Sequence, residues 1–125
     1  MDSSAPLVLV LEDSVLVAMA IEAALADRGL AVVAAGSVAA ARDRLSRAPV
    51  AAALLDLQLP DGNSLELARE LNAAGCPVAI CSGLDGGAAA DGLPATKHFL
   101  KPVDAEILAA WVADALASPE EDRPS

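Results

Sequence analysis

The stretch Ala51-Ala52-Ala53-Leu54-Leu55-Asp56 predicts a strand that is buried on both faces and ends in a carboxylate. Its apolar residues do not alternate with polar ones, and such unbroken runs are typical of parallel sheets that helices cover on both sides. Comparable short runs occupy residues 7–11, 31–35, 78–81 and 98–100, and each is followed at once by polar residues or glycine. The chain therefore carries a regular series of predicted strands.

Helical stretches separate these runs at residues 14–28, 37–47, 64–74 and 104–116. Ser37 and Asp104 stand where N-caps are expected, and Gly29 stands where a helix ends. Residues 84–94 differ, because glycines and a proline surround three alanines and each glycine costs a helix about 1 kcal/mol. This alternation predicts an α/β fold, a doubly wound (βα)5 unit with a parallel sheet and a short or mobile fourth helix.

Length and composition narrow the class of protein. The 125 residues make one domain, expected over residues 1–117, and the charged segment 118–125 is expected to be a disordered acidic tail. Hydrophobic residues make up 55%, which excludes a disordered chain. The net charge of −10 argues against direct contact with nucleic acid or a membrane surface. Two cysteines outside any C-x-x-C pattern indicate a reduced, cytoplasmic protein.

Chemically active side chains follow four of the predicted strands: Glu12, Asp13, Asp56, Ser82 and Lys101. Parallel strands end at one edge of the sheet, where ligands of such folds bind. Carboxylates crowded there repel one another unless a cation joins them, and hard oxygen ligands suit Mg²⁺. A carboxylate beside Mg²⁺ can attack a phosphoryl group, while an ammonium and a hydroxyl hold the phosphoryl oxygens. A single acid at a strand end is usually a cap or a solvated charge, so the convergence of all five carries the inference.

These residues resemble the receiver domains of two-component response regulators. The matching features are Glu12-Asp13, Asp56, the segment 59–62 (Leu-Pro-Asp-Gly), Ser82-Gly83 and Lys101-Pro102, in the family's order. The resemblance extends from residue 7 to about residue 116. Within the family, the chain resembles stand-alone, single-domain receivers. It implies a flavodoxin-like five-stranded sheet of order 2-1-3-4-5.

The resemblance also implies a phosphorelay function. Asp56 would accept a phosphoryl group from a sensor histidine kinase or a histidine phosphotransferase, and the switched protein would bind a downstream partner. Asp13, Asp56 and the backbone carbonyl of Gln58 would bind Mg²⁺, and Glu12 would assist through water. Ser82 and Lys101 would hold the phosphoryl oxygens. Such a protein is a signalling switch that catalyses only its own phosphorylation and dephosphorylation, not an enzyme acting on another substrate.

One position departs from the family pattern. Receivers usually carry Tyr or Phe three residues before the lysine, whereas His98 stands there in this chain, and Phe99 should face the opposite side of the strand. Two interpretations stay open for His98: a modified switch residue that acts with Ser82, or a half-buried strand residue hydrogen-bonded to a neighbour.

Two other functions are compatible with the sequence. A phosphorylation-independent docking module would keep the fold and bind partners equally well after Asp56→Asn. A metal-dependent phosphatase of the haloacid-dehalogenase type would need an aspartate two residues after the nucleophile, where this chain has Gln58. The intact set of strand-end residues favours the switch over both.

The first predicted helix carries a possible partner surface. If Glu22 faces solvent, Val15, Ala18 and Leu25 share its face. In the receiver domains that this chain resembles, the first helix docks against the helical bundle of the phosphoryl donor. The alternative is a wide buried stripe in an alanine-rich helix, and Ala18→Glu separates the two by blocking transfer from a protein donor only.

Overall fold

The computed structural model describes residues 5–83 and 96–117. Five strands form a parallel sheet of order β2-β1-β3-β6-β7, which is the predicted 2-1-3-4-5 order of the main strands. The strands are β1 (Leu7–Leu11), β2 (Ala31–Ala35), β3 (Ala52–Asp56), β6 (Val78–Ser82) and β7 (Thr96–Leu100). The predicted fourth helix and the predicted tail at 118–125 lie outside the described residues.

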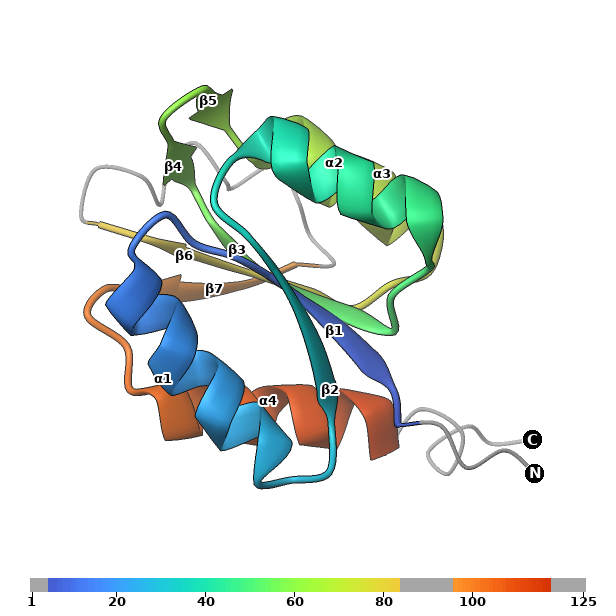
Figure 1. Cartoon of the computed structure of the whole chain (residues 1–125), viewed down its shortest axis with the longest axis vertical. Coiled ribbons are helices and arrows are strands. Elements are labelled where there is room, and N and C mark those ends of the chain that lie inside the picture. Colours follow the sequence, from blue (N-terminus) through green and yellow to red (C-terminus); the bar gives the residue numbers. More distant parts are fainter. Residues whose placement is uncertain (1–4, 84–95, 118–125) are drawn as a thin grey trace.

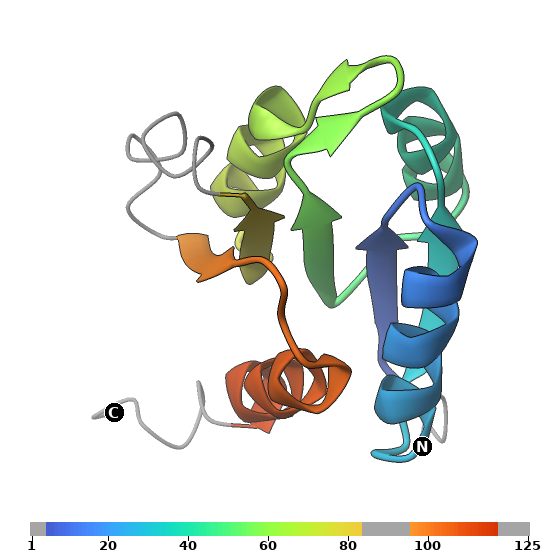
Figure 2. The ribbon, with the colours of Figure 1, turned by 90° about the vertical axis from the view of Figure 1, so that its left-hand side faces the viewer.

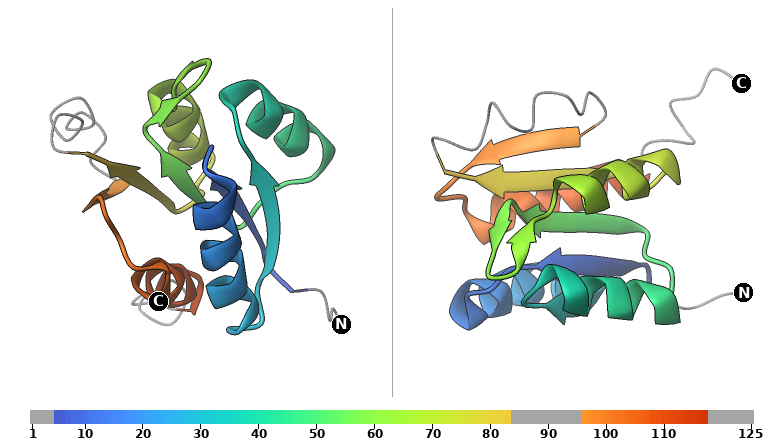
Figure 3. Two further views of the ribbon diagram at one scale, coloured as in Figure 1. Left: turned by 60° about the vertical axis from the view of Figure 1, so that its left-hand side comes forward. Right: turned by 90° about the horizontal axis from the view of Figure 1, so that it is seen from above.

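Two layers of helices enclose the sheet (Figures 1 and 3). The helices are α1 (Val15–Ala26), α2 (Val38–Arg47), α3 (Leu65–Ala73) and α4 (Ala105–Ala117). Leu9, Leu55 and Ile80 pack toward α2 and α3, whereas Val10 and Leu54 pack toward α1 and α4. Alternate residues of each central strand therefore bury opposite faces, which explains why these runs contain no polar residue. Within the described ranges, no helix is long and apolar enough to cross a membrane.

A small hairpin that sequence analysis did not predict follows the central strand. It consists of β4 (Gln58–Leu59) and β5 (Gly62–Asn63), which pair antiparallel. Gly62 makes the turn with a φ of 140°, a conformation open to glycine. The hairpin projects beyond the carboxyl end of β3, between the starts of α2 and α3 (Figure 2).

Two side chains cap the amino end of α2, one from the adjacent residue and one from a distant part of the sequence. The Ser37 hydroxyl accepts a hydrogen bond from the Ala40 amide at 3.1 Å, as predicted for an N-cap. The Asp61 carboxylate of the hairpin turn accepts hydrogen bonds from the Val38 and Ala39 amides at 2.9 and 3.0 Å. The hairpin is thereby tied to the start of α2, with a negative charge at the positive end of the helix.

The Asp61 cap predicts a pH-dependent loss of stability. Hydrogen bonds from the Val38 and Ala39 amides hold the pKa of the Asp61 carboxyl below its usual value. The stabilisation by the charged cap is therefore present above the pKa of the unfolded chain and is lost as the pH falls through the lowered pKa of the folded state. Asp61→Ala should therefore lower the urea midpoint more at pH 7 than at pH 3. Equal losses at both pH values, measured by circular dichroism, would contradict the charged cap.

The exposure of α1 differs from the predicted strip. Glu22 is exposed and Val15 is 71% exposed, but Ala18 is half-buried and Leu25 is fully buried. Of the two alternatives left open for this helix, the exposed strip is wrong at Leu25, which is buried together with Ile21. The exposed large apolar residues of α1 instead lie in its first turns: Val15, Leu16, Val17 and Met19.

Candidate functional site

The carboxyl edge of the sheet brings the predicted site residues together. β1 and β3 are neighbours, so Glu12 and Asp13 follow Leu11 beside the end of β3 at Asp56. On the other side, Asp56 lies opposite Cys81, the residue before Ser82. The Lys101 amide donates to the Ser82 carbonyl at 2.8 Å, which joins the last strand to the same edge.

Three carboxylates form the centre of this edge. Glu12, Asp13 and Asp56 each offer an oxygen atom, and these atoms lie within 4.8 Å of one another. Glu12 is 8% exposed and Asp56 is 6% exposed, whereas Asp13 faces solvent. Such closeness between partly buried negative charges is costly without a cation.

Lys101 supplies one positive charge to the cluster. Its Nζ lies 2.6 Å from Asp56 Oδ1 and 3.7 Å from Glu12 Oε1. Burial acts to lower the pKa of the Lys101 ammonium, but the contacts with Asp56 and Glu12 outweigh it and raise that pKa. The lysine therefore stays protonated and bridges strands β1 and β3 from the end of β7.

Opposing interactions act on the pKa of the Glu12 carboxyl. Burial raises the pKa of its carboxyl, a hydrogen bond from the Ser14 amide at 3.0 Å opposes the rise, and the Asp56 charge adds to it. One lysine thus faces three carboxylates, so the cluster has an excess of negative charge that a divalent cation would neutralise.

The donor set at this edge fits Mg²⁺. Carboxylate oxygens are hard ligands, and the exposed Asp13 leaves the site open to the waters that Mg²⁺ keeps. Gln58 begins the hairpin two residues after Asp56, so its backbone carbonyl lies in the segment that follows Asp56. Both cysteines are protonated thiols, because burial raises the pKa of Cys81 to about 12 and that of Cys76 to about 11.

The two proposed switch residues differ in exposure. Ser82 is buried at the end of β6. His98 pairs with Ile80, two residues before Ser82, so both side chains lie on the same face of the sheet. His98 is exposed, so the expectation of a half-buried histidine was wrong. Phe99 packs against the α1 and α4 side, as predicted.

Ser64 is a residue near the site that sequence analysis missed. It is fully buried, and its hydroxyl donates a hydrogen bond to the backbone carbonyl of Asp56 at 2.7 Å. A serine before a helix is normally interpreted as a cap, and nothing local in the sequence distinguishes this other role.

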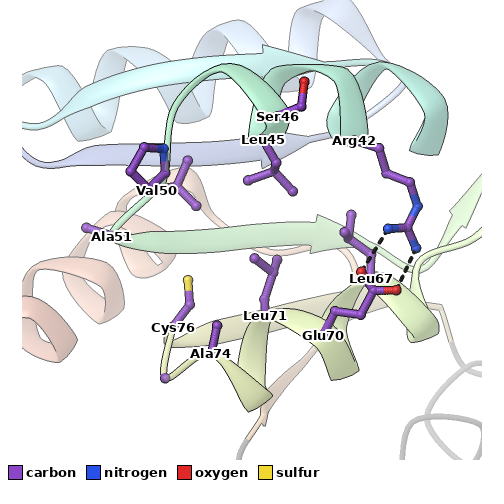
Figure 4. A pocket seen from close by; sticks show the side chains of 12 residues that line it. Arg42, Leu45, Ser46, Val50, Ala51, Leu67, Glu70, Leu71, Ala74 and Cys76 are labelled. Carbon is purple, nitrogen blue, oxygen red and sulfur yellow. Dashed lines mark hydrogen bonds and ion pairs between the residues drawn. The ribbon is translucent and has the colours of Figure 1, made fainter.

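Two cavities differ in their distance from this edge. One, of about 440 Å³, lies beside it and is lined by Glu12 and Lys101 together with apolar residues of α1 and α4. The other, of about 700 Å³, lies between α2 and α3 toward the amino ends of the strands, where Arg42 and Glu70 form an ion pair at 2.8 Å across it (Figure 4). Only the first adjoins the charged residues described above.

Residues 8–113 match the family described as the response regulator receiver domain. Over 95 residues, 75% of this chain, the sequence is 37% identical to protein-glutamate methylesterase/protein-glutamine glutaminase 1 of Anaeromyxobacter dehalogenans (strain 2CP-C). The matched part is 27% of that protein, so this chain is similar to about a quarter of its length.

Solved structures show the same fold. A CheY-like response regulator receiver domain protein from Methanospirillum hungatei JF-1 has a TM-score of 0.82 at 20% identity, covering 96% of this chain and all of that one. A sensor protein from Polaromonas sp. JS666 has a TM-score of 0.76 at 27% identity, covering 89% and 95% of the two chains. Since the family match includes every strand end described above, the chain belongs to the response regulator receiver domain family.

Proposed function

We propose that this receiver domain accepts a phosphoryl group on Asp56 from a phosphohistidine donor in a Mg²⁺-dependent reaction, and that this changes its binding to partners. The observation that carries the proposal is the cluster of three carboxylates with Lys101 paired to Asp56 at 2.6 Å. Family membership supports a role in two-component signalling, as a switch and not as an enzyme acting on other substrates.

Asp13, Asp56 and the Gln58 carbonyl are the ligands we propose for Mg²⁺, with Glu12 acting through water. When bound, the ion supplies positive charge that neutralises phosphoryl oxygens during transfer. An Asp56 carboxylate oxygen forms a bond to phosphorus while the bond from phosphorus to the donor imidazole nitrogen breaks. The imidazole leaves with that electron pair. Lys101 and the Ser82 hydroxyl hold the phosphoryl oxygens.

The conformational response is assigned to Ser82 and His98. Movement of Ser82 toward the phosphoryl group would open space on its face of the sheet, which His98 shares. The exposure of His98 supports this, since no packing has to be broken for the ring to turn. A phosphorylation-independent docking module does not need the paired Lys101 and Asp56, and that pair argues for the switch.

The partners we propose are a sensor histidine kinase or histidine phosphotransferase and an unidentified downstream protein. The net charge of −10 argues against direct contact with nucleic acid or a membrane surface. A cytoplasmic location is proposed as well, because both cysteines are free, as in reducing compartments.

Intact-protein mass spectrometry tests the proposed reaction. After incubation with acetyl phosphate and Mg²⁺, the wild-type protein should gain the mass of one phosphoryl group, because Asp56 can then attack an activated phosphorus. Asp56→Asn and an EDTA-treated sample should gain none. If neither acetyl phosphate nor a set of phosphorylated histidine kinases labels the wild-type protein, the docking module replaces the switch.

A further inference from the structure

We propose that Ser64 is a positioning residue for the metal site. Its hydrogen bonds fix the backbone between Asp56 and Gln58, and this backbone in turn orients the Gln58 carbonyl that would bind Mg²⁺. The inference rests on the proposed function and goes beyond it, because the Ser64 hydroxyl bonds to the backbone carbonyl of Asp56 and not to one of the proposed ligand atoms.

Ser64 is the N-cap residue of α3, yet its side chain makes no capping hydrogen bond. The adjacent Asn63 side chain accepts from the Leu65 amide at 3.0 Å instead. The Ser64 hydroxyl points back to β3 and donates to the Asp56 carbonyl at 2.7 Å. Both atoms are buried, where a polar group without a partner costs more than a hydrogen bond normally contributes. The hydroxyl therefore serves the acceptor strand and not the helix.

The contacts of Ser64 hold two successive peptide groups. In the peptide between Asp56 and Leu57, the Asp56 carbonyl accepts a hydrogen bond from the Ser64 hydroxyl. The amide of the same peptide, that of Leu57, donates to the Cys81 carbonyl of the neighbouring strand at 3.0 Å. In the next peptide, the Leu57 carbonyl accepts from the Ser64 amide at 3.0 Å. Both peptides immediately precede the Gln58 carbonyl, so the direction in which the chain leaves Asp56 is fixed on both sides.

Metal ligands bind tightly only when their surroundings hold them in place, and loss of such a support costs about 10–100-fold in metal affinity. Ser64→Ala removes the hydroxyl while keeping the backbone amide. The Asp56 carbonyl then loses its partner, and the segment up to Gln58 gains freedom that Mg²⁺ binding must remove. We expect the Mg²⁺ dissociation constant to rise about tenfold.

The test is isothermal titration calorimetry of Mg²⁺ into the unphosphorylated full chain. Ser46→Ala is the matched control, because it removes a serine hydroxyl that also donates to a backbone carbonyl at 2.7 Å, but at the end of α2, toward the amino ends of the strands. A weaker affinity in Ser64→Ala with an unchanged affinity in Ser46→Ala supports the proposal. Faster amide hydrogen exchange at Leu57 and Gln58 in the metal-free variant is the second expected readout.

Two results overturn the positioning role: an unchanged Mg²⁺ affinity in Ser64→Ala, or equal losses in both variants, which would reflect general destabilisation. If Ser64→Ala does not fold, Ser64→Gly removes the same hydroxyl without adding bulk and is judged by the same criteria. Wild-type protein that binds no Mg²⁺ would instead overturn the metal site of the proposed function, so the two failures are distinguishable.

Discussion

Lys101→Ala is expected to slow phosphorylation of Asp56 by acetyl phosphate by about 100-fold or more, the usual cost of removing one group that stabilises a transition state. In the resting protein the Lys101 ammonium contacts both Asp56 and Glu12. During transfer the negative charge on the phosphoryl oxygens adds to that of the three carboxylates. Without the lysine, no protein cation contacting this cluster within the described residues would balance it.

The same variant should become more dependent on metal for its stability. Removing the ammonium leaves Glu12, Asp13 and Asp56 within 4.8 Å of one another without their ion pair, so the metal-free variant should unfold at a lower temperature. Without the competing ammonium, the carboxylates should bind Mg²⁺ more tightly. Mg²⁺ should then raise the unfolding temperature more in the variant than in the wild type, because a ligand that binds more tightly stabilises the folded state more. Thermal unfolding with and without Mg²⁺ measures both effects.

Lys97→Ala is the matched control. Lys97 lies on β7, the strand that Lys101 follows, and its Nζ stands 5.3 Å from the centre of the Phe99 ring. This variant loses the same formal charge but should keep the wild-type phosphorylation rate and the wild-type response to Mg²⁺. Equal behaviour of the two variants would show that total charge, and not the contact with Asp56, governs the site.

The position of the site could be predicted from the sequence because the strands are short and apolar. Runs such as 51–55 have no interior polar residue, so each strand ends where its first charge appears, at Asp56 or at Glu12. Parallel topology then forces those ends to one edge, and the confirmed strand order brings Asp56 between Glu12 and Ser82. Local composition was sufficient because the geometry of the sheet supplied the rest.

The missed features depend on contacts between residues distant in the sequence or on helices without a clear apolar face. The Asp61 carboxylate caps α2 across 22 and 23 residues, and no short-range pattern identifies it. Ser64 has the sequence position of a cap but bonds to Asp56. Helix α1 is apolar on nearly all sides, so spacing could not show that Leu25 is buried while Leu16 is exposed.

The exposed start of α1 leads to the last prediction. Leu16 is 79% exposed and Met19 is 57% exposed, on a helix that begins two residues after Asp13. Val17 of the same turn lines the cavity beside Lys101, so apolar surface continues from the helix to the acidic edge. Exposed apolar clusters of this kind mark protein interaction sites, so we expect the proposed phosphohistidine donor to dock here, beside Asp56.

Leu16→Glu should therefore slow phosphotransfer from a histidine kinase by about 100-fold, the effect of losing a central contact in a protein interface. Phosphorylation by acetyl phosphate should not change, because a small donor needs no docking surface and an exposed side chain adds little to stability. The measurement uses autophosphorylated histidine kinases, choosing the one that transfers fastest to the wild type. Ala73→Glu, an exposed position on α3 across the sheet, is the control. Equal loss with both donors would indicate damage to the acidic edge itself, and no loss with the kinase would move the docking surface away from α1.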